Sequence, residues 1–458
     1  MAQDKHALTE GSISKQMILF ALPIFLGNLF QQFYNTFDSW CVGHFIGDNA
    51  LAAVSSSGSL IFMMIGFFNG VAMGAGVLIA RYFGAKDYEN MRRAIHTDVL
   101  FGLCAGVLLS LLGVLLTPTI LVWMDTPENV LPLSIEYFRF FFCGTVFTVT
   151  YNIFVGILHA VGDSRHPLYY LIFASSLNVG LDLLFVGVFG WGVWSAALAT
   201  TFSQGVSALL CFIKLIRVRE PYQLKLREVR FHGPTFKKIL SYGLPSGVQN
   251  SVIALANVVV QSNINSFGGE AMAGCGSYSK IEGFGFLPIT CFTQALSTFV
   301  SQNLGAGKHD RVKKGVRFGL IAAILLAEGV GVIFYLFAPQ LIGIFNDNPV
   351  VIDYGVRHTR TISLFFCLLA LSHCMAAILR GAGRAKVPMF SMLGCWCVFR
   401  VTYITVALRF VNRLEIVSSA YPITWTLSTI VLGIYLLSAN WMNTFDREIK
   451  KEALKASS

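Results

Sequence analysis

Four polar side chains share one face of the first apolar segment of the chain. Gln31, Tyr34, Asn35 and Asp38 follow the i, i+3, i+4, i+7 spacing of neighbouring positions on a helix. An ionisable group inside a bilayer costs several kcal/mol unless it is paired or hydrated. A carboxylate at the end of such a row therefore indicates a functional site.

A second polar row stands in the fifth apolar segment, where Asn178 and Asp182 are spaced i, i+4. Asn152 in the fourth segment and Thr200 in the sixth lie near mid-span and can join them. Carboxylate, amide and hydroxyl oxygens suit a hard cation better than a transition metal. We predict a site that binds H⁺ or Na⁺, with no other metal and no cofactor. Its expected residues are Asp38, Asn178, Asp182, Thr200 and Asn152, the first three being the expected ligands of Na⁺.

The composition places these residues in a membrane. Hydrophobic residues make up 55% of the chain, charged residues 13%, and the mean hydropathy is +0.64. Soluble chains usually carry about 25% charged residues, so the sequence predicts an all-α integral protein that crosses the cell (plasma or inner) membrane many times. The net charge of +10 lies mostly in short gaps between apolar runs, which indicates topology and excludes nucleic acid as the expected partner.

The apolar runs predict twelve spans, since a membrane-spanning helix needs roughly 20 apolar residues. The expected spans are 16–44, 51–82, 95–117, 134–158, 168–188, 192–214, 239–266, 272–303, 316–338, 356–379, 388–408 and 416–440. Lys and Arg concentrate in the even-numbered gaps, and the first, third, fifth and seventh gaps hold none. By the positive-inside rule, both termini are predicted to be cytoplasmic.

The chain also repeats itself. Ala21–Pro23 matches Gly243–Pro245, and Gly84–Ala85 matches Gly305–Ala306, at an offset of about 221 residues. Six spans per half is an even number, so both halves enter the membrane in the same sense, as two parallel lobes around a central cavity. The expected domains are an N-lobe at 1–214, a cytoplasmic connector at 215–238, and a C-lobe with a cytoplasmic tail at 239–458.

The repeat serves as an internal control for the polar rows. It places Val260 where the first half has Asp38, and Tyr403 where it has Asp182. A polar cluster whose only role is to hydrogen-bond one helix to another would more often recur in both halves. The asymmetry favours function over that alternative.

The second half offers weaker candidates. Asn257 and Gln261 share a face of the seventh span and would give the second half a hydrated surface. His373 in the tenth span either lines the cavity or packs against its neighbours, which is the commoner outcome. Lys280 and Glu282 either form a structural ion pair, which is the commoner outcome, or take part in binding substrate. Two further charged residues within apolar runs keep open roles: Glu328 and Arg400.

Together these features resemble the MATE (multidrug and toxic compound extrusion) family. The likeness spans residues 12–445 and rests on the Ala-Leu-Pro opening at Ala21–Pro23, on Tyr-Asn-Thr-Phe-Asp-Ser at Tyr34–Ser39, on Asn178-x-x-x-Asp182 and on Gln302–Ala306. It implies a secondary antiporter that expels small amphipathic organic cations in exchange for Na⁺ or H⁺.

The resemblance also implies roles for single residues. Asp38, Asn178 and Asp182 match the family's N-lobe cation site, and Asn152 and Thr200 match its flanking positions. Three residues match cavity positions more loosely: Gln31, Tyr34 and Tyr137. Another branch of the family carries carboxylates that would fall near Ile253 and Leu369, so this chain resembles the branch whose cation site lies in the N-lobe.

The leading hypothesis is therefore export of drugs by rocker-switch alternating access. The alternative is a flippase for lipid-linked saccharides from a related two-lobe family, which would line its cavity with Arg or Lys. No phosphate-cradling GxxxxGK[ST] motif is present, and the gaps are too short for a catalytic domain, so an enzyme is not expected. The sequence leaves the oligomeric state open, and a monomer in the bilayer is our working expectation.

Cysteine-accessibility labelling tests the predicted orientation. In a cysteine-free background, Lys237→Cys should react with a membrane-impermeant thiol reagent only from the cytoplasmic side, because the connector is basic. Glu128→Cys, in the third gap, should react only from the opposite side. Labelling of both positions from one side would overturn the assignment of spans.

Overall fold

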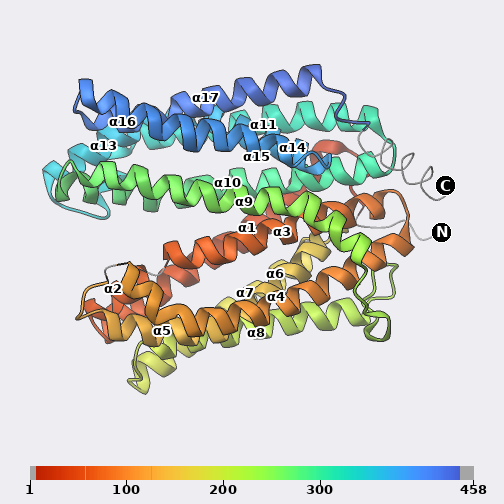
Figure 1. Cartoon of the computed structure of the whole chain (residues 1–458), viewed down its shortest axis with the longest axis horizontal. Helices are drawn as coiled ribbons and strands as arrows, with labels where there is room; N and C mark the ends of the chain where they lie inside the picture. Colours follow the sequence, from red (N-terminus) through yellow and green to blue (C-terminus); the bar gives the residue numbers. More distant parts are fainter. Residues whose placement is uncertain (1–6, 57, 125, 444–458) are drawn as a thin grey trace. The chain divides into compact units, whose positions relative to one another are not determined.

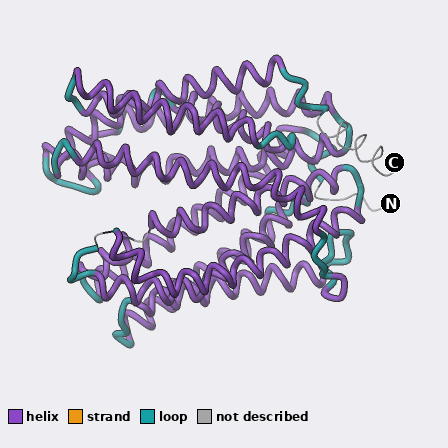
Figure 2. The backbone as a smooth tube through the Cα atoms, in the orientation of Figure 1, coloured by secondary structure: helices purple, strands orange, loops and turns teal. Residues whose placement is uncertain are grey.

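Helices make up almost all of the backbone that the structure describes. The computed structural model covers residues 7–56, 58–124 and 126–443, and no strand is present within these ranges (Figure 1, Figure 2). The predicted cytoplasmic tail, after residue 443, lies outside the described residues. The prediction of an all-α chain is confirmed.

The helices of the first half carry the two polar rows. They are α1 (Ile13–Phe45), α2 (Asp48–Ser56), α3 (Gly58–Gly84), α4 (Tyr88–Trp123), α5 (Leu131–Cys143), α6 (Thr145–Ala160), α7 (Arg165–Asp182) and α8 (Trp194–Arg217). A π-helix, Leu183–Val188, continues α7 without a break.

The second half repeats this order. A 3₁₀ turn, Leu226–Glu228, lies in the connector. The helices that follow are α9 (Gly233–Asn265), α10 (Gly269–Gly305), α11 (His309–Leu336), α12 (Ala338–Gly343), α13 (Pro349–Ser363), α14 (Phe366–Gly381), α15 (Lys386–Met392), α16 (Arg400–Phe410) and α17 (Leu414–Ser438). A second π-helix, Leu393–Phe399, joins α15 to α16.

Each predicted span corresponds to one helix or to consecutive helical segments. Nine helices of the described residues are long and apolar enough to cross a bilayer, and two bent pairs raise the number to eleven. The predicted span 51–82 corresponds to α2 and α3. The twelve-span, two-lobe fold class is therefore confirmed.

Two predicted spans prove to be bent pairs at equivalent places in the repeat. α5 and α6 meet at 45°, and α13 and α14 meet at 54°. At the first bend, Gly144 lies against Thr201 of α8, and a Cβ on this glycine would come within 2.2 Å of the Thr201 side chain. The bend therefore brings α5 and α6 closer to α8 than any larger residue allows. In contrast, Pro23, Pro245 and Pro288 lie inside continuous helices.

The chain folds into two compact units that exchange the beginnings of their first helices. One unit contains Leu22–Gly247, and the other contains Leu8–Ala21 and the chain from Val248 onward. α1 thus changes unit next to Pro23, and α9 changes unit close to Pro245. The predicted domain limits follow the sequence repeat and stay a prediction.

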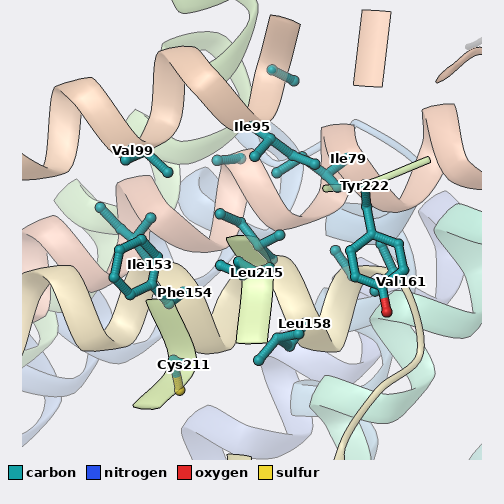
Figure 3. Close-up of a cluster of buried hydrophobic side chains, with 14 of the residues drawn as sticks. Ile79, Ile95, Val99, Ile153, Phe154, Leu158, Val161, Cys211, Leu215 and Tyr222 are labelled. Atoms are coloured by element: carbon teal, nitrogen blue, oxygen red, sulfur yellow. The ribbon is translucent and has the colours of Figure 1, made fainter. Parts of the chain in front are cut away.

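The core of the first unit is a cluster of aliphatic and aromatic side chains on α3, α4, α6 and α8. Figure 3 shows Ile79, Ile95, Ile153 and Leu215 converging in it. Tyr222 of the connector belongs to the same cluster. Part of the predicted connector is therefore packed into the first unit.

The second unit holds the segment that precedes α1 in a similar way. The backbone amide of Leu8 donates to Gln302 Oε1 at 2.9 Å, and Asn303 Nδ2 donates to the Leu8 carbonyl at 3.2 Å. Arg311 donates to the carbonyl of Gly11 at 2.7 Å. Gln302 and Asn303, which belong to one of the motifs above, therefore anchor the chain in this unit.

A close backbone contact within the first unit joins α3 to the beginning of α9. Gly70 and Gly74 on α3 face Gly243 and Gly247 on α9, an i, i+4 glycine pair on each helix. A Cβ on Gly74 would lie 2.2 Å from the Gly243 backbone nitrogen. Small residues permit such an approach in membrane bundles, where helix packing depends on van der Waals contact.

This contact predicts a loss of stability for Gly74→Ala. The added methyl group must push the two backbones apart, which costs about 1–3 kcal/mol. Thermal unfolding in detergent should show a lower midpoint than the wild type. Gly180→Ala is the matched control, because nothing lies within 4 Å of its Cβ position, and its midpoint should not fall. A Gly74→Ala protein as stable as the control would contradict the contact.

Candidate functional site

Two helices of the first unit bury the predicted coupling residues. α1 buries Tyr34 and Asp38, and α7 buries Asn178 and Asp182. In both helices the two side chains are spaced i, i+4, so they lie one above the other on the buried face. Asp182 is the last residue of α7 before the π-helix, an irregularity that often marks functional positions in helices.

The carboxylates keep acceptor oxygens that nothing satisfies. Within the described residues, Asp38 Oδ1, Asn178 Oδ1 and both carboxylate oxygens of Asp182 are buried and have no hydrogen-bond partner. The two negative charges are also close enough to repel each other. A buried acceptor without a donor costs about 1–3 kcal/mol, and more when it is charged. Protonation or a bound cation removes this cost.

The neighbouring hydrogen bonds leave those oxygens untouched. Asn178 Nδ2 donates to Thr200 Oγ1 at 3.5 Å, at the outer limit of a hydrogen bond. Gln204 Nε2 of α8 donates to the Tyr34 hydroxyl at 2.9 Å. The amide of Asn178 is thus turned so that its nitrogen faces α8, while its oxygen stays free.

The structure brings together most, but not all, of the predicted residues. Tyr34 and Tyr137 are both near enough to interact with the charges of Asp38 and Asp182, and Gln31 hydrogen-bonds to Tyr34. For two other predicted residues, the described chain shows no hydrogen bond to this cluster. Asn152 is half-buried without a hydrogen bond to the described residues, and Asn35 is exposed on α1.

The weaker candidates of the second unit do not form a comparable cluster. Asn257 and Gln261 are exposed on α9, and Gln261 donates to Asn265 at 2.8 Å. His373 packs edge-on against the rings of Phe286 and Trp396, at centroid distances of 4.9 and 5.4 Å. Its observed contacts are those of a packing histidine.

The four charged candidates of the second unit each have a partner among the described residues. Glu282 accepts from the Tyr278 hydroxyl at 3.1 Å, and Lys280 lies over the Phe345 ring. Among the described residues Lys280 and Glu282 make no ion pair, so the predicted pair is wrong: each side chain has a nearer partner. Two other residues complete this set. Glu328 accepts from the Cys367 amide, and Arg400 donates to Thr424 Oγ1 at 2.9 Å.

Sequence analysis missed two polar residues of the first unit. Gln204 follows Thr200 by four positions on α8, so the i, i+4 rule could have found it. Asp98 of α4 is a further buried carboxylate, and its Oδ1 has no partner in the described chain. It lies close to the N-terminal end of the predicted span 95–117, where a charged side chain costs less free energy than at mid-span.

Twelve apolar spans in two repeated halves, with unsatisfied carboxylates in one of them, define the architecture of a membrane transporter. The chain belongs to the MatE family, whose sequence profile matches residues 23–184 and again residues 245–406. One match falls in each half, which confirms the repeat. The assignment to the branch with an N-lobe cation site stays a prediction.

Relatives of similar length exist in several bacteria. The chain is similar to the probable multidrug resistance protein YoeA of Bacillus subtilis, with 28% identity over 93% of this chain and 93% of that protein. It is also similar to the probable multidrug resistance protein NorM of Thermotoga maritima, with 28% identity over 84% of this chain and 83% of that protein.

Solved structures share the fold. A transporter of the MOP superfamily from Pyrococcus furiosus superimposes with a TM-score of 0.88 at 24% identity, over 93% of this chain and 96% of that chain.

The unsatisfied oxygens predict opposite effects for two buried aspartates of the first unit. Asp182→Asn should raise the midpoint of thermal unfolding in Na⁺-free detergent at alkaline pH, which favours the ionised form of both carboxyl groups, by about 1–3 kcal/mol of stability, because it removes a repelling charge and adds a donor. Asp163→Asn is the matched comparison. Asp163 is as deeply buried, but it accepts from His166 Nδ1 at 2.6 Å.

Asp163→Asn should therefore lower the midpoint, since it weakens a hydrogen bond worth about 1.5–3 kcal/mol to a charged group. If both variants lose stability equally, the oxygens of Asp182 have donors in solution and the site is not poised for a cation.

Proposed function

We propose that this protein is a secondary active antiporter that exports small organic cations in exchange for H⁺ or Na⁺ by rocker-switch alternating access. The coupling ion binds at Asp38, Asn178 and Asp182, with Thr200 beside them. The protein acts as a monomer in the plasma or inner membrane, with both termini in the cytoplasm.

One observation carries the proposal: the buried oxygens of Asp38, Asn178 and Asp182 that have no donor in the described chain. Such oxygens fit a hard cation or a proton. The two carboxylates repel each other, so binding one positive charge removes both the repulsion and the unmet hydrogen bonds. Packing alone gives no reason to keep two acids in this position.

The nature of the cargo follows from the same charges. A site with two carboxylates attracts cations, and the named relatives, YoeA and NorM, are probable multidrug resistance proteins. A flippase for anionic lipid-linked saccharides would need free basic residues in its cavity. The buried Arg400 already donates to Thr424 and lies against the rings of Tyr421 and Trp396, so it does not favour the flippase.

Coupling requires that the ion and the drug compete for the carboxylate pair. The ion binds in the outward-open state, where it displaces the drug, and it leaves in the inward-open state, where the drug takes its place. The protein changes between the two states only with one of the two cations bound. A ligand with equal affinity for both conformations moves neither. The free energy of the ion gradient thus drives the drug through a difference in ion affinity between the two states.

Efflux of a fluorescent organic cation from reconstituted vesicles tests this mechanism. A pH gradient and a Na⁺ gradient are imposed separately, and the ion that supports uphill efflux is the coupling ion. Asp38→Asn and Asp182→Asn should abolish coupled efflux, while the proteins still fold and insert. Asn178→Ala and Thr200→Ala should only weaken the apparent ion affinity, because each removes one neutral ligand.

Glu328→Gln is the matched control, since it neutralises a carboxylate of the second unit that accepts a backbone amide. It should keep most of the efflux rate. An Asp38→Asn protein that pumps the dye uphill at the wild-type rate would exclude the proposed site. Stronger loss in Glu328→Gln than in Asp38→Asn would move the coupling site to the other half.

A further inference from the structure

A second feature of the first unit is a basic cavity outside the carboxylate site. It has a volume of about 360 Å³ and lies between the first turns of α4 and the connector. Four arginines line it: Arg92 and Arg93 from α4, and Arg227 and Arg230 from the connector. Two glutamates and two histidines complete the wall.

The acidic residues of this wall are already committed to other partners. Glu89 forms an ion pair with Arg93, and Glu228 forms one with Lys225 at 3.1 Å. The hydrogen bond from Lys225 lowers the pKa of Glu228, as do nearby positive charges. The other three arginines have no hydrogen-bond or ion-pair partner among the described residues. Arg92 still interacts with the charge of Glu228, but four arginines against two glutamates leave the wall of the cavity with an excess of positive charge, which an anion bound there neutralises.

The connector is held in place before any ligand arrives. The backbone amides of Lys225 and His232 donate to His96 Nε2 and Thr97 Oγ1 of α4, both at 3.4 Å. Tyr222 is anchored in the buried cluster of the first unit (Figure 3). The arginines of the connector therefore stand on a fixed backbone, so binding costs little ordering entropy.

The same segment exposes apolar side chains that a free anion does not explain. Leu226 is 58% exposed and Phe231 is 51% exposed, and they flank Arg227 and Arg230 in the sequence. A few residues further along α4, the helix becomes a strongly apolar span. Basic side chains next to exposed leucine and phenylalanine at the edge of a span are typical of contact with an anionic membrane surface.

We propose that this cavity binds the phosphate headgroup of an anionic phospholipid. Arg92, Arg227 and Arg230 donate to the phosphate oxygens, which the planar guanidinium groups can bind with two parallel hydrogen bonds each. Leu226 and Phe231 contact the glycerol and the first methylenes of the acyl chains. The inference does not depend on the transport mechanism proposed above.

At the equivalent place in the second unit, the chain itself supplies the acceptors for an arginine. The repeat puts Asp310 and Lys314 where α4 has Glu89 and Arg93, and a cavity of about 540 Å³ lies there too. The arginine at that cavity, Arg311, donates to backbone carbonyls of the N-terminal segment. The chain itself occupies that guanidinium, whereas the arginines of the first unit remain available.

Lipid binding to the purified full-length protein tests the proposal. Native mass spectrometry measures retention from an equimolar mixture of phosphatidylglycerol and phosphatidylcholine, and a titration gives the affinity. The wild type should retain phosphatidylglycerol preferentially. The triple variant Arg92→Gln/Arg227→Gln/Arg230→Gln should bind it about 100-fold more weakly, which is about 3 kcal/mol, at about 1 kcal/mol for each basic residue. If the triple variant does not purify as a monodisperse protein, Arg230→Gln alone should weaken binding about 5-fold.

A control variant separates the cavity from general surface charge. Arg165→Gln/Arg219→Gln/Lys237→Gln removes the same charge from exposed positions of the same unit that do not line the cavity, and it should bind as the wild type does. Equal losses in both triple variants, or no loss in the cavity variant, would overturn the site. A last experiment compares the unfolding midpoint in inorganic phosphate with the midpoint in phosphatidylglycerol. If both ligands raise it equally, the cavity binds free phosphate and the lipid assignment is wrong.

Discussion

A buried oxygen in a bilayer needs a donor, and the chemistry of the first unit follows from that requirement. The hydrocarbon core offers no water to replace a missing hydrogen bond. Asp38, Asn178 and Asp182 nevertheless keep acceptors that no described residue satisfies, while the amide nitrogen of Gln204 donates to the Tyr34 hydroxyl. Under the proposed function, this lack of donors is what gives the site its affinity for a positive charge, because a bound proton or cation interacts with the acceptor oxygens that the fold leaves without donors.

The two repeated halves share one helix order but bury charges of opposite sign: carboxylates in the first unit and the guanidinium of Arg400 in the second. Position 421, which the repeat equates with Thr200, is a tyrosine, and its ring lies 4.6 Å from the guanidinium carbon of Arg400. Arg400 is 2% exposed and donates to Thr424. A guanidinium stays charged at any physiological pH. The second unit thus carries a permanent cation near the repeat position at which the first unit would hold an exchangeable one, and the proposed function therefore places ion exchange in one half of the chain.

Patterns that depend on one helix were predictable, and contacts between helices were not. Hydropathy located the spans, and the i, i+4 spacing placed Asn178 above Asp182. The bond from Gln204 to Tyr34 depends on how α8 is rotated against α1, which no local pattern encodes. The predicted pair of Lys280 and Glu282 failed for the same reason: on the folded helices, an aromatic ring and a tyrosine hydroxyl are the nearer partners. The bends at the fourth and tenth spans were invisible because apolar residues continue through them.

A single hydrogen bond can supply the difference in ion affinity that the proposed transport cycle requires. A tenfold difference in ion affinity corresponds to about 1.4 kcal/mol, and a hydrogen bond to a charged group contributes about 1.5–3 kcal/mol. Gaining or losing one donor to Asp38 or Asp182 therefore changes the affinity about 10- to 100-fold. The Tyr34 hydroxyl accepts from Gln204, so its own proton is free for such a bond, and Tyr137 lies near the same charges. Because Asp182 is the last residue before a π-helix, a small rotation of that irregular turn can direct its carboxylate toward these hydroxyls or away from them. Under the proposed function, a rearrangement of these few side chains would accompany the rocker-switch motion and set the difference in ion affinity between its two states.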